Sequence, residues 1–265
     1  TRGLYFPNTD EITWSEINLH TNKISTFRVP GVAGWPVFYK HRLYFVTYIN
    51  KTNSLFFKEN GLDKPVSVSE AAPKLMPPSQ DEIVESLLSL DINSYEVHSV
   101  VDREGNFNWE ITFDRDGNAY GLISRYLDRP FPRVRNSSDL VVVFRPEERR
   151  VVKVVPLPEQ PVPAQSMIWH QGKLYVAYYD DDSLAGDTLA VFDAKTFEPI
   201  KVLRDFPGPV DLEADADRLF VLCNHNSNDV NGSVEIVDLN NLKVMKTISV
   251  GKRPKRIVIL PAVKQ

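Results

Sequence analysis

The densest group of acidic side chains in the sequence points to metal binding. Asp180, Asp181 and Asp182 are consecutive, and Asp187 follows shortly after them. Ca²⁺ prefers carboxylate oxygens, so these four residues are the predicted metal ligands and Ca²⁺ is the one cofactor candidate. Their spacing does not match the Asp-x-Asp-x-Asp-Gly calcium loop. A solvated acidic turn is therefore the favoured interpretation, and calcium binding is the alternative.

Arginine is concentrated in two places where it could hold an anion. Guanidinium groups bind carboxylates and phosphates through paired hydrogen bonds, so a carboxylate, a phosphate or a sugar acid would suit them. A self-repelling loop without a ligand explains the first group equally well. The candidates are Arg125, Arg129 and Arg133 in a long loop, and Arg253 and Arg256 near the C-terminus.

Two tryptophans are expected at the start of inner strands, where they could stack on a ring or a sugar. These are Trp35 and Trp109. Aromatic rings bury a large apolar area, so packing between structural units is the favoured interpretation and ligand stacking is the alternative.

The single cysteine and the five histidines give little support for catalysis. Cys223 and His225 would point to the same side if both lay on one strand. No third group to orient them is evident, so a buried thiol is the favoured interpretation. Asn224 and His225 are retained as ligand-binding candidates. The sequence contains no nucleophile-elbow, Walker, dinucleotide or zinc-protease motif, so it leaves open whether the protein is an enzyme.

These candidates depend on a repeated β-pattern that positions them. A turn followed by leucine, an aromatic residue and a hydrophobic residue recurs, with its leucines at Leu4, Leu43, Leu174 and Leu219. A period of roughly 40–50 residues is typical of four-stranded propeller blades. The pattern predicts an all-β fold, a single β-propeller over residues 1–265 with six four-stranded blades, five or seven being the alternatives. The best helix candidate is residues 79–90, and the structure of residues 61–108 is the least defined.

The two ends of the chain carry complementary parts of one repeat. Residues 3–6 match the second strand of a blade, and residues 256–261 match a first strand. Pairing them would close the ring with one blade shared by the termini, which removes exposed sheet edges. Propellers usually meet ligands on the face formed by the loops after the second and fourth strands of each blade.

The C-terminal part resembles the YVTN-type β-propeller repeat of bacteria and archaea. The matching pieces are Leu174-Tyr175-Val176, the aspartates Asp193 and Asp238 after third strands, and the ending Val250-Gly251 before Pro254. This resemblance implies a propeller and an extracytoplasmic location, at the cell surface or in the periplasm. It does not imply a reaction, because one fold carries many functions.

Composition narrows the function further. The 31 Lys and Arg residues against 35 Asp and Glu give a net charge of −4, which argues against a nucleic-acid binder. No apolar run is long enough for a membrane span. Three glycosylation sequons, at Asn50, Asn136 and Asn231, all fall in loops of one predicted face.

The sequence thus favours a non-enzymatic scaffold that binds a protein partner or a small anionic or carbohydrate ligand on its loop face. Two alternatives stay open. One is a metal-assisted hydrolase or lyase of the six-bladed lactonase kind, and the other is a subunit of a cofactor-containing complex.

Overall fold

The computed structural model describes residues 11–17, 24–30, 32–33, 36–50, 66–67, 83–91, 93–94, 97–104, 109–124, 138–180 and 183–259. The chain divides into two compact units. Unit 1 comprises residues 1–108, 132–134 and 144–152, and unit 2 comprises residues 109–131, 135–143 and 153–265.

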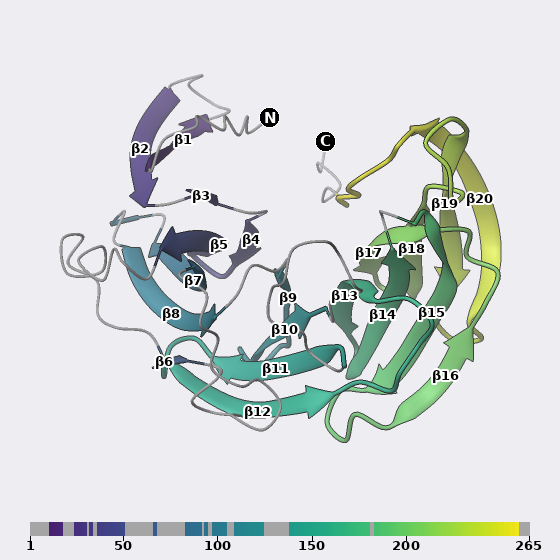
Figure 1. Cartoon of the computed structure of the whole chain (residues 1–265), viewed down its shortest axis with the longest axis horizontal. Coiled ribbons are helices and arrows are strands. Elements are labelled where there is room, and N and C mark those ends of the chain that lie inside the picture. Colours follow the sequence, from purple (N-terminus) through teal and green to yellow (C-terminus); the bar gives the residue numbers. More distant parts are fainter. Residues whose placement is uncertain are drawn as a thin grey trace. The chain divides into compact units, whose positions relative to one another are not determined.

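Three four-stranded sheets follow one another along the chain, each with its strands in sequence order (Figure 1). This meandering order is that of a propeller blade. The first sheet contains β9 (Trp109–Phe113), β10 (Ala119–Ile123), β11 (Leu140–Arg145) and β12 (Arg150–Pro156). The second contains β13 (Ala164–His170), β14 (Lys173–Asp180), β15 (Ala185–Asp193) and β16 (Pro199–Leu203). The third contains β17 (Pro209–Asp215), β18 (Arg218–Cys223), β19 (Asn231–Asp238) and β20 (Lys243–Lys252).

The core of unit 2 lies between these sheets because successive side chains of a strand point to opposite faces. On β14, Leu174 and Val176 pack with Tyr120 and Val141 of the preceding sheet. The intervening Tyr175 and Ala177 pack instead with residues of the following sheet, among them Leu219 and Val221. Strands β14 and β15 of the second sheet are therefore buried on both faces, which explains their continuous apolar runs.

The aspartate that ends each of the third strands β15 and β19 closes the next hairpin turn. The Asp193 carboxylate accepts hydrogen bonds from the backbone N–H groups of Lys195 and Thr196, at 2.9 and 2.8 Å. The Asp238 carboxylate accepts one from the N–H of Asn240 at 2.8 Å. Aspartate is favoured at such positions because its short side chain satisfies turn N–H groups. These bonds also lower the pKa of Asp193.

Unit 1 contains a larger sheet and a hairpin. The sheet has the order β3 (Val32–Ala33), β5 (Arg42–Asn50), β7 (Ile83–Asp91), β8 (Val97–Glu104) and β6 (Val66–Ser67), and β4 (Val37–Tyr39) also pairs with β5. Strand β6 runs parallel to β8, whereas β5, β7 and β8 pair antiparallel. The hairpin consists of β1 (Glu11–Ile17) and β2 (Ile24–Pro30).

The best helix candidate, residues 79–90, is a strand where the structure describes it, because Ile83–Asp91 form β7. Its spacing of apolar residues suits a helical turn, but β5 and β8 pair with it on its two sides. Leu87, Leu88 and Leu90 are all buried. A short apolar run buried on both faces cannot be distinguished from a helix by periodicity alone.

The all-β propeller prediction is confirmed at the level of the fold, whereas the number of blades is not. The described residues form four blade-like sheets rather than six, together with the β1–β2 hairpin. Residues 256–259 are described and are not in a strand, while residues 3–6 and 260–261 lie outside the described part of the chain. Ring closure therefore stays a prediction.

Candidate functional site

Three loop segments of unit 2 are joined by backbone hydrogen bonds into one surface, which we call the loop rim. It comprises residues 183–187, 204–208 and 224–231. The N–H of Phe206 donates to the Asp187 carbonyl at 3.1 Å, and that of Gly208 donates to the Gly186 carbonyl at 2.9 Å. The N–H of Asn224 donates in turn to the Gly208 carbonyl at 2.9 Å. These three segments therefore lie side by side.

Two glycines allow this close approach of backbones. Gly208 has φ +66°, and a Cβ there would lie 2.0 Å from Asn224 Oδ1. Gly186 has φ +144°, and a Cβ there would lie 2.4 Å from the Tyr178 carbonyl oxygen. Both positions therefore exclude other residues by backbone conformation and by contact.

Asn224 is a buried residue of the rim, and its side-chain amide bonds to two neighbouring residues. Its side chain is buried, its Nδ2 donates to the Tyr179 hydroxyl, and its Oδ1 accepts the Asn226 N–H at 2.9 Å. The structure thus gives this predicted ligand-binding residue a positioning contact on each end of its amide.

His225 is exposed on the rim in the left-handed conformation, with φ +60°. Its Nε2 lies 2.9 Å from the Ser233 hydroxyl, which donates to Glu235 Oε1 at 2.6 Å. Cys223 and His225 do not lie on one strand, since β18 ends at Cys223. Cys223 is fully buried, and burial raises the pKa of its thiol, so it is an unreactive core residue.

Arg253 and Arg256, predicted as anion-binding residues, have different surroundings. Arg253 is exposed beside the rim, and its Nε donates to the Asn228 carbonyl at 3.4 Å. Arg256 is part of a second group on the inner strands, which we call the inner-strand cluster. This cluster consists of Glu110 on β9, Asp211 and Glu213 on β17, and Arg256.

One guanidinium nitrogen links the acids of the inner-strand cluster. Arg256 Nη1 lies 2.7 Å from Glu110 Oε1 and 3.3 Å from Asp211 Oδ1. The Ile257 N–H donates to Asp211 Oδ2 at 2.8 Å, and the Ser166 hydroxyl donates to Oδ1 at 3.2 Å. The guanidinium thus occupies the position between two carboxylates that a bound cation would take.

Burial dominates the electrostatics of this cluster. It raises the pKa of Glu110 to about 6, although Arg256 opposes the change. Burial likewise raises the pKa of Asp211 and that of Glu213, and the negative charge of Asp211 adds to the effect at Glu213. Each of these three carboxylates therefore binds a proton more readily than an ordinary carboxylate does.

The predicted metal ligands are only partly described. Asp180 accepts a hydrogen bond from the Ser183 hydroxyl at 2.6 Å. Asp187 accepts one from the Thr188 hydroxyl at 2.7 Å and lies 3.6 Å from Arg204 Nη1. Within the described ranges, no group of three or more His, Cys, Asp or Glu side chains is arranged to hold a metal ion.

Several predicted residues cannot be placed. Trp35, Arg125, Arg129, Arg133, Asp181 and Asp182 lie outside the described residues, as does the sequon residue Asn136. Trp109 begins β9, where its backbone pairs with Ile123 of β10. Asn50 ends β5, and Asn231 begins β19 with its side chain exposed.

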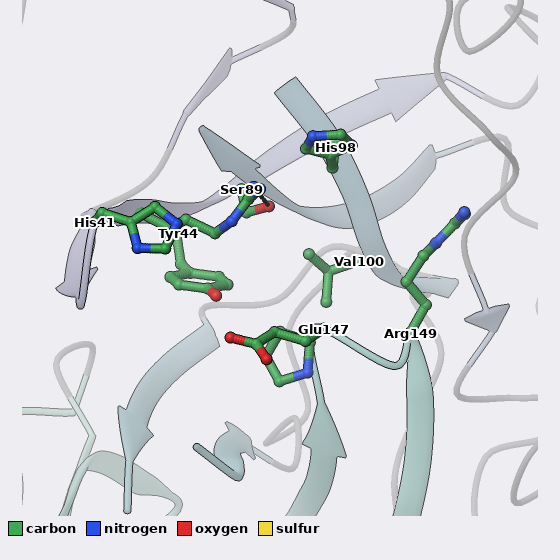
Figure 2. A pocket seen from close by; sticks show the side chains of 9 residues that line it. His41, Tyr44, Ser89, His98, Val100, Glu147 and Arg149 are labelled. Atoms are coloured by element: carbon green, nitrogen blue, oxygen red, sulfur yellow. Dashed lines mark hydrogen bonds between the residues drawn. The ribbon is translucent and has the colours of Figure 1, made fainter. Parts of the chain in front are cut away.

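A polar pocket in unit 1 was not predicted from the sequence (Figure 2). It has a volume of about 380 Å³, and its lining includes His41, Arg42, Tyr44, His98, Glu147 and Arg149. Two of these are histidines from separate elements, His41 in the turn between β4 and β5 and His98 on β8. The pairing of β5, β7 and β8 brings them to one pocket, and no local sequence signal reveals that register.

Solved structures similar to this one share its fold. A crystal structure of a nidogen/laminin complex matches with a TM-score of 0.52 and 13% identity, covering 90% of this chain and 75% of that one. Dihydro-heme d1 dehydrogenase NirN in complex with DHE matches with a TM-score of 0.50 and 12% identity. That match covers 92% of this chain but only 44% of the NirN chain.

Together with the order of strands in the sheets, these likenesses show a β-propeller. At such low identity they show the fold alone. No protein-family model matches the sequence, and no curated protein matches it. The part of the chain that the structure describes contains no helix that is long and apolar enough to cross a membrane.

Proposed function

We propose that this protein is a propeller scaffold that binds a protein partner through the loop rim. The observation that carries the proposal is the chain of backbone hydrogen bonds from Asp187 through Gly208 to Asn224. Because main-chain bonds hold the rim, it keeps its shape before a partner arrives, and little ordering entropy is lost on binding.

The side chains on the rim suit a polar interface. His225, Asp229, Val230 and Arg253 are exposed there, and they supply both signs of charge and an apolar contact. The nidogen/laminin neighbour is itself a complex of two proteins, which supports a partner of this class. The finer predictions belong to the same proposal: a six-bladed ring closed by its termini, the YVTN repeat family, and a cell-surface or periplasmic location.

A photo-crosslinking amino acid, incorporated into the full chain in the cells from which the protein comes, tests this proposal. It is placed at Asp229 on the rim and, as a matched control, at Lys201 on the exposed outer strand β16. The expected result is a covalent adduct with a second protein from position 229 and none from position 201. Equal adducts from both positions, or none from position 229, would contradict the proposal.

A further inference from the structure

The pocket of unit 1 has a net positive lining. Arg42, Arg149 and the neighbouring Lys40 contribute three cations, whereas Glu147 and the adjacent Asp91 contribute two anions. His41 and His98 also line it. A pocket with a surplus of cationic donors attracts an anion.

Arg42 is fixed in place before any ligand binds. Its Nη1 donates to the Ser89 hydroxyl at 3.2 Å, and its Nη2 lies 3.8 Å from Asp91 Oδ2. Asp91 is fixed in turn, because its Oδ1 accepts the N–H groups of Asn93 and Ser94 at 2.9 and 3.1 Å. A guanidinium carries five N–H donors, so this arrangement orients Arg42 without using all of them.

Arg149 lines the pocket from the turn between β11 and β12. It has φ +49°, and its N–H donates to the Pro146 carbonyl at 3.2 Å. Figure 2 shows Arg149 on the opposite side of Val100 from Tyr44 and Glu147. Residues 146–149 belong to unit 1, so the whole pocket lies within that unit.

Two further groups favour hydroxyls on the ligand. Burial raises the pKa of Tyr44 to about 12, so its phenol stays protonated and can donate a hydrogen bond. Glu147 presents a largely exposed carboxylate, which accepts hydrogen bonds from hydroxyl groups but repels a bare anion. The volume of about 380 Å³ suits a molecule of monosaccharide size.

We propose that this pocket binds a small anion carried on a hydroxylated skeleton, such as a sugar acid or a sugar phosphate. The arginines hold the carboxylate or phosphate, and Glu147 and Tyr44 contact the hydroxyls. The site is separate from the loop rim, so the proposal stands independently of the protein-binding function.

Calorimetric titration of the full chain at pH 7 tests the proposal. The probes are D-glucuronate and D-glucose 6-phosphate, and D-glucose and inorganic phosphate are the controls. We expect one or both of the anionic sugars to bind and both controls to bind at least tenfold more weakly. Which of the two anionic sugars binds more tightly identifies the anionic group. Failure of both at millimolar concentration, or equal binding of a control, would overturn the proposal.

Arg149→Asn removes the charge while keeping a residue that tolerates a left-handed backbone. It should weaken the binding of the anionic sugar about tenfold or more, since it removes a charge-assisted hydrogen bond. Arg150→Gln is the matched control, because Arg150 is an exposed neighbour that pairs with Glu148 outside the pocket. It should leave affinity within about twofold. If Arg149→Asn fails to fold, His98→Gln, at an exposed position of β8, is tested in its place. A folded variant that binds the anionic sugar with unchanged affinity would contradict the proposed site.

Discussion

Gly208 is the residue on which the shape of the loop rim depends most directly. A side chain at position 208 would be unfavourable for two reasons, the positive φ and the closeness of a Cβ to Asn224. Two other glycines of the chain allow these two effects to be measured separately. Gly172 has φ +77°, and a Cβ added there would have nothing within 4 Å, whereas Gly251 has neither a positive φ nor a close neighbour.

Gly208→Ala should therefore be the most destabilising of three alanine substitutions. Gly172→Ala should cost about 1 kcal/mol through backbone strain alone, and Gly251→Ala should be close to neutral. Gly208→Ala should cost clearly more than Gly172→Ala, because the added carbon meets Asn224 as well. Chemical denaturation measures the three values, and equal costs at 208 and 172 would show that the contact with Asn224 relaxes easily.

Sequence reasoning can reach interactions between residues that are close in the chain, but not those between residues that are distant. The aspartates that end β15 and β19 act on N–H groups two or three residues away, so their role could be inferred from the repeat. The bond between Arg256 and Glu110 joins residues 146 positions apart. Only the packing of the inner strands brings these two side chains together, so no local pattern could predict the pair.

At the scale of the element, β20 is an exposed outermost strand of ten residues. Val244, Met245 and Ile248 are 49%, 57% and 42% exposed, and Lys246 interrupts them in the sequence. An apolar edge strand can pair with a second chain, and lysine at such an edge opposes this. Figure 1 shows β20 in yellow as the last strand of its sheet.

Lys246→Val should therefore promote aggregation. It creates an uncharged run from Val244 to Val250 with high β-propensity. Light scattering during slow heating should show earlier aggregation than for the wild type. Lys255→Val removes the same charge from an exposed position outside the strands, and it should not change the onset. Identical behaviour of both variants would indicate that net charge, and not the edge, controls solubility.

At the scale of the whole molecule, the inner-strand cluster determines the response to mild acid. The pKa of Glu110 in the folded chain is about 6, above its ordinary value of 4.5. The folded state therefore holds this proton more tightly than the unfolded state does. The stability that the proton confers is fully present below pH 4.5 and is lost as pH rises through about 6.

Lowering the pH from 7.5 to 5.5 should consequently stabilise the protein, by about 0.8 kcal/mol from Glu110. Carboxylates with a lowered pKa, such as Asp91 and Asp193, reduce stability only below their ordinary value of 3.8 and do not oppose this change. Thermal unfolding across this range measures the effect. Glu110→Gln should reduce the pH dependence, and a wild-type melting temperature that falls on acidification would contradict the assignment.

The propeller fold could be inferred from the sequence because a repeated structural unit makes the same residue pattern recur at a regular spacing. The blade count could not be, because the irregular residues 61–108 obscure that period and β7 joins a larger sheet. The pocket of unit 1 could not be predicted for the same reason, since much of its lining comes from that sheet.

Because backbone hydrogen bonds hold the loop rim together, its shape does not depend on the side chains that it exposes. Outward side chains such as those of Asp229 and Arg253 are not needed to join Asp187, Gly208 and Asn224. Randomising these outward positions while keeping Gly186, Gly208 and Asn224 should yield libraries in which most members fold. Variants that bind new partners could then be selected from such a library without changing the backbone of the rim.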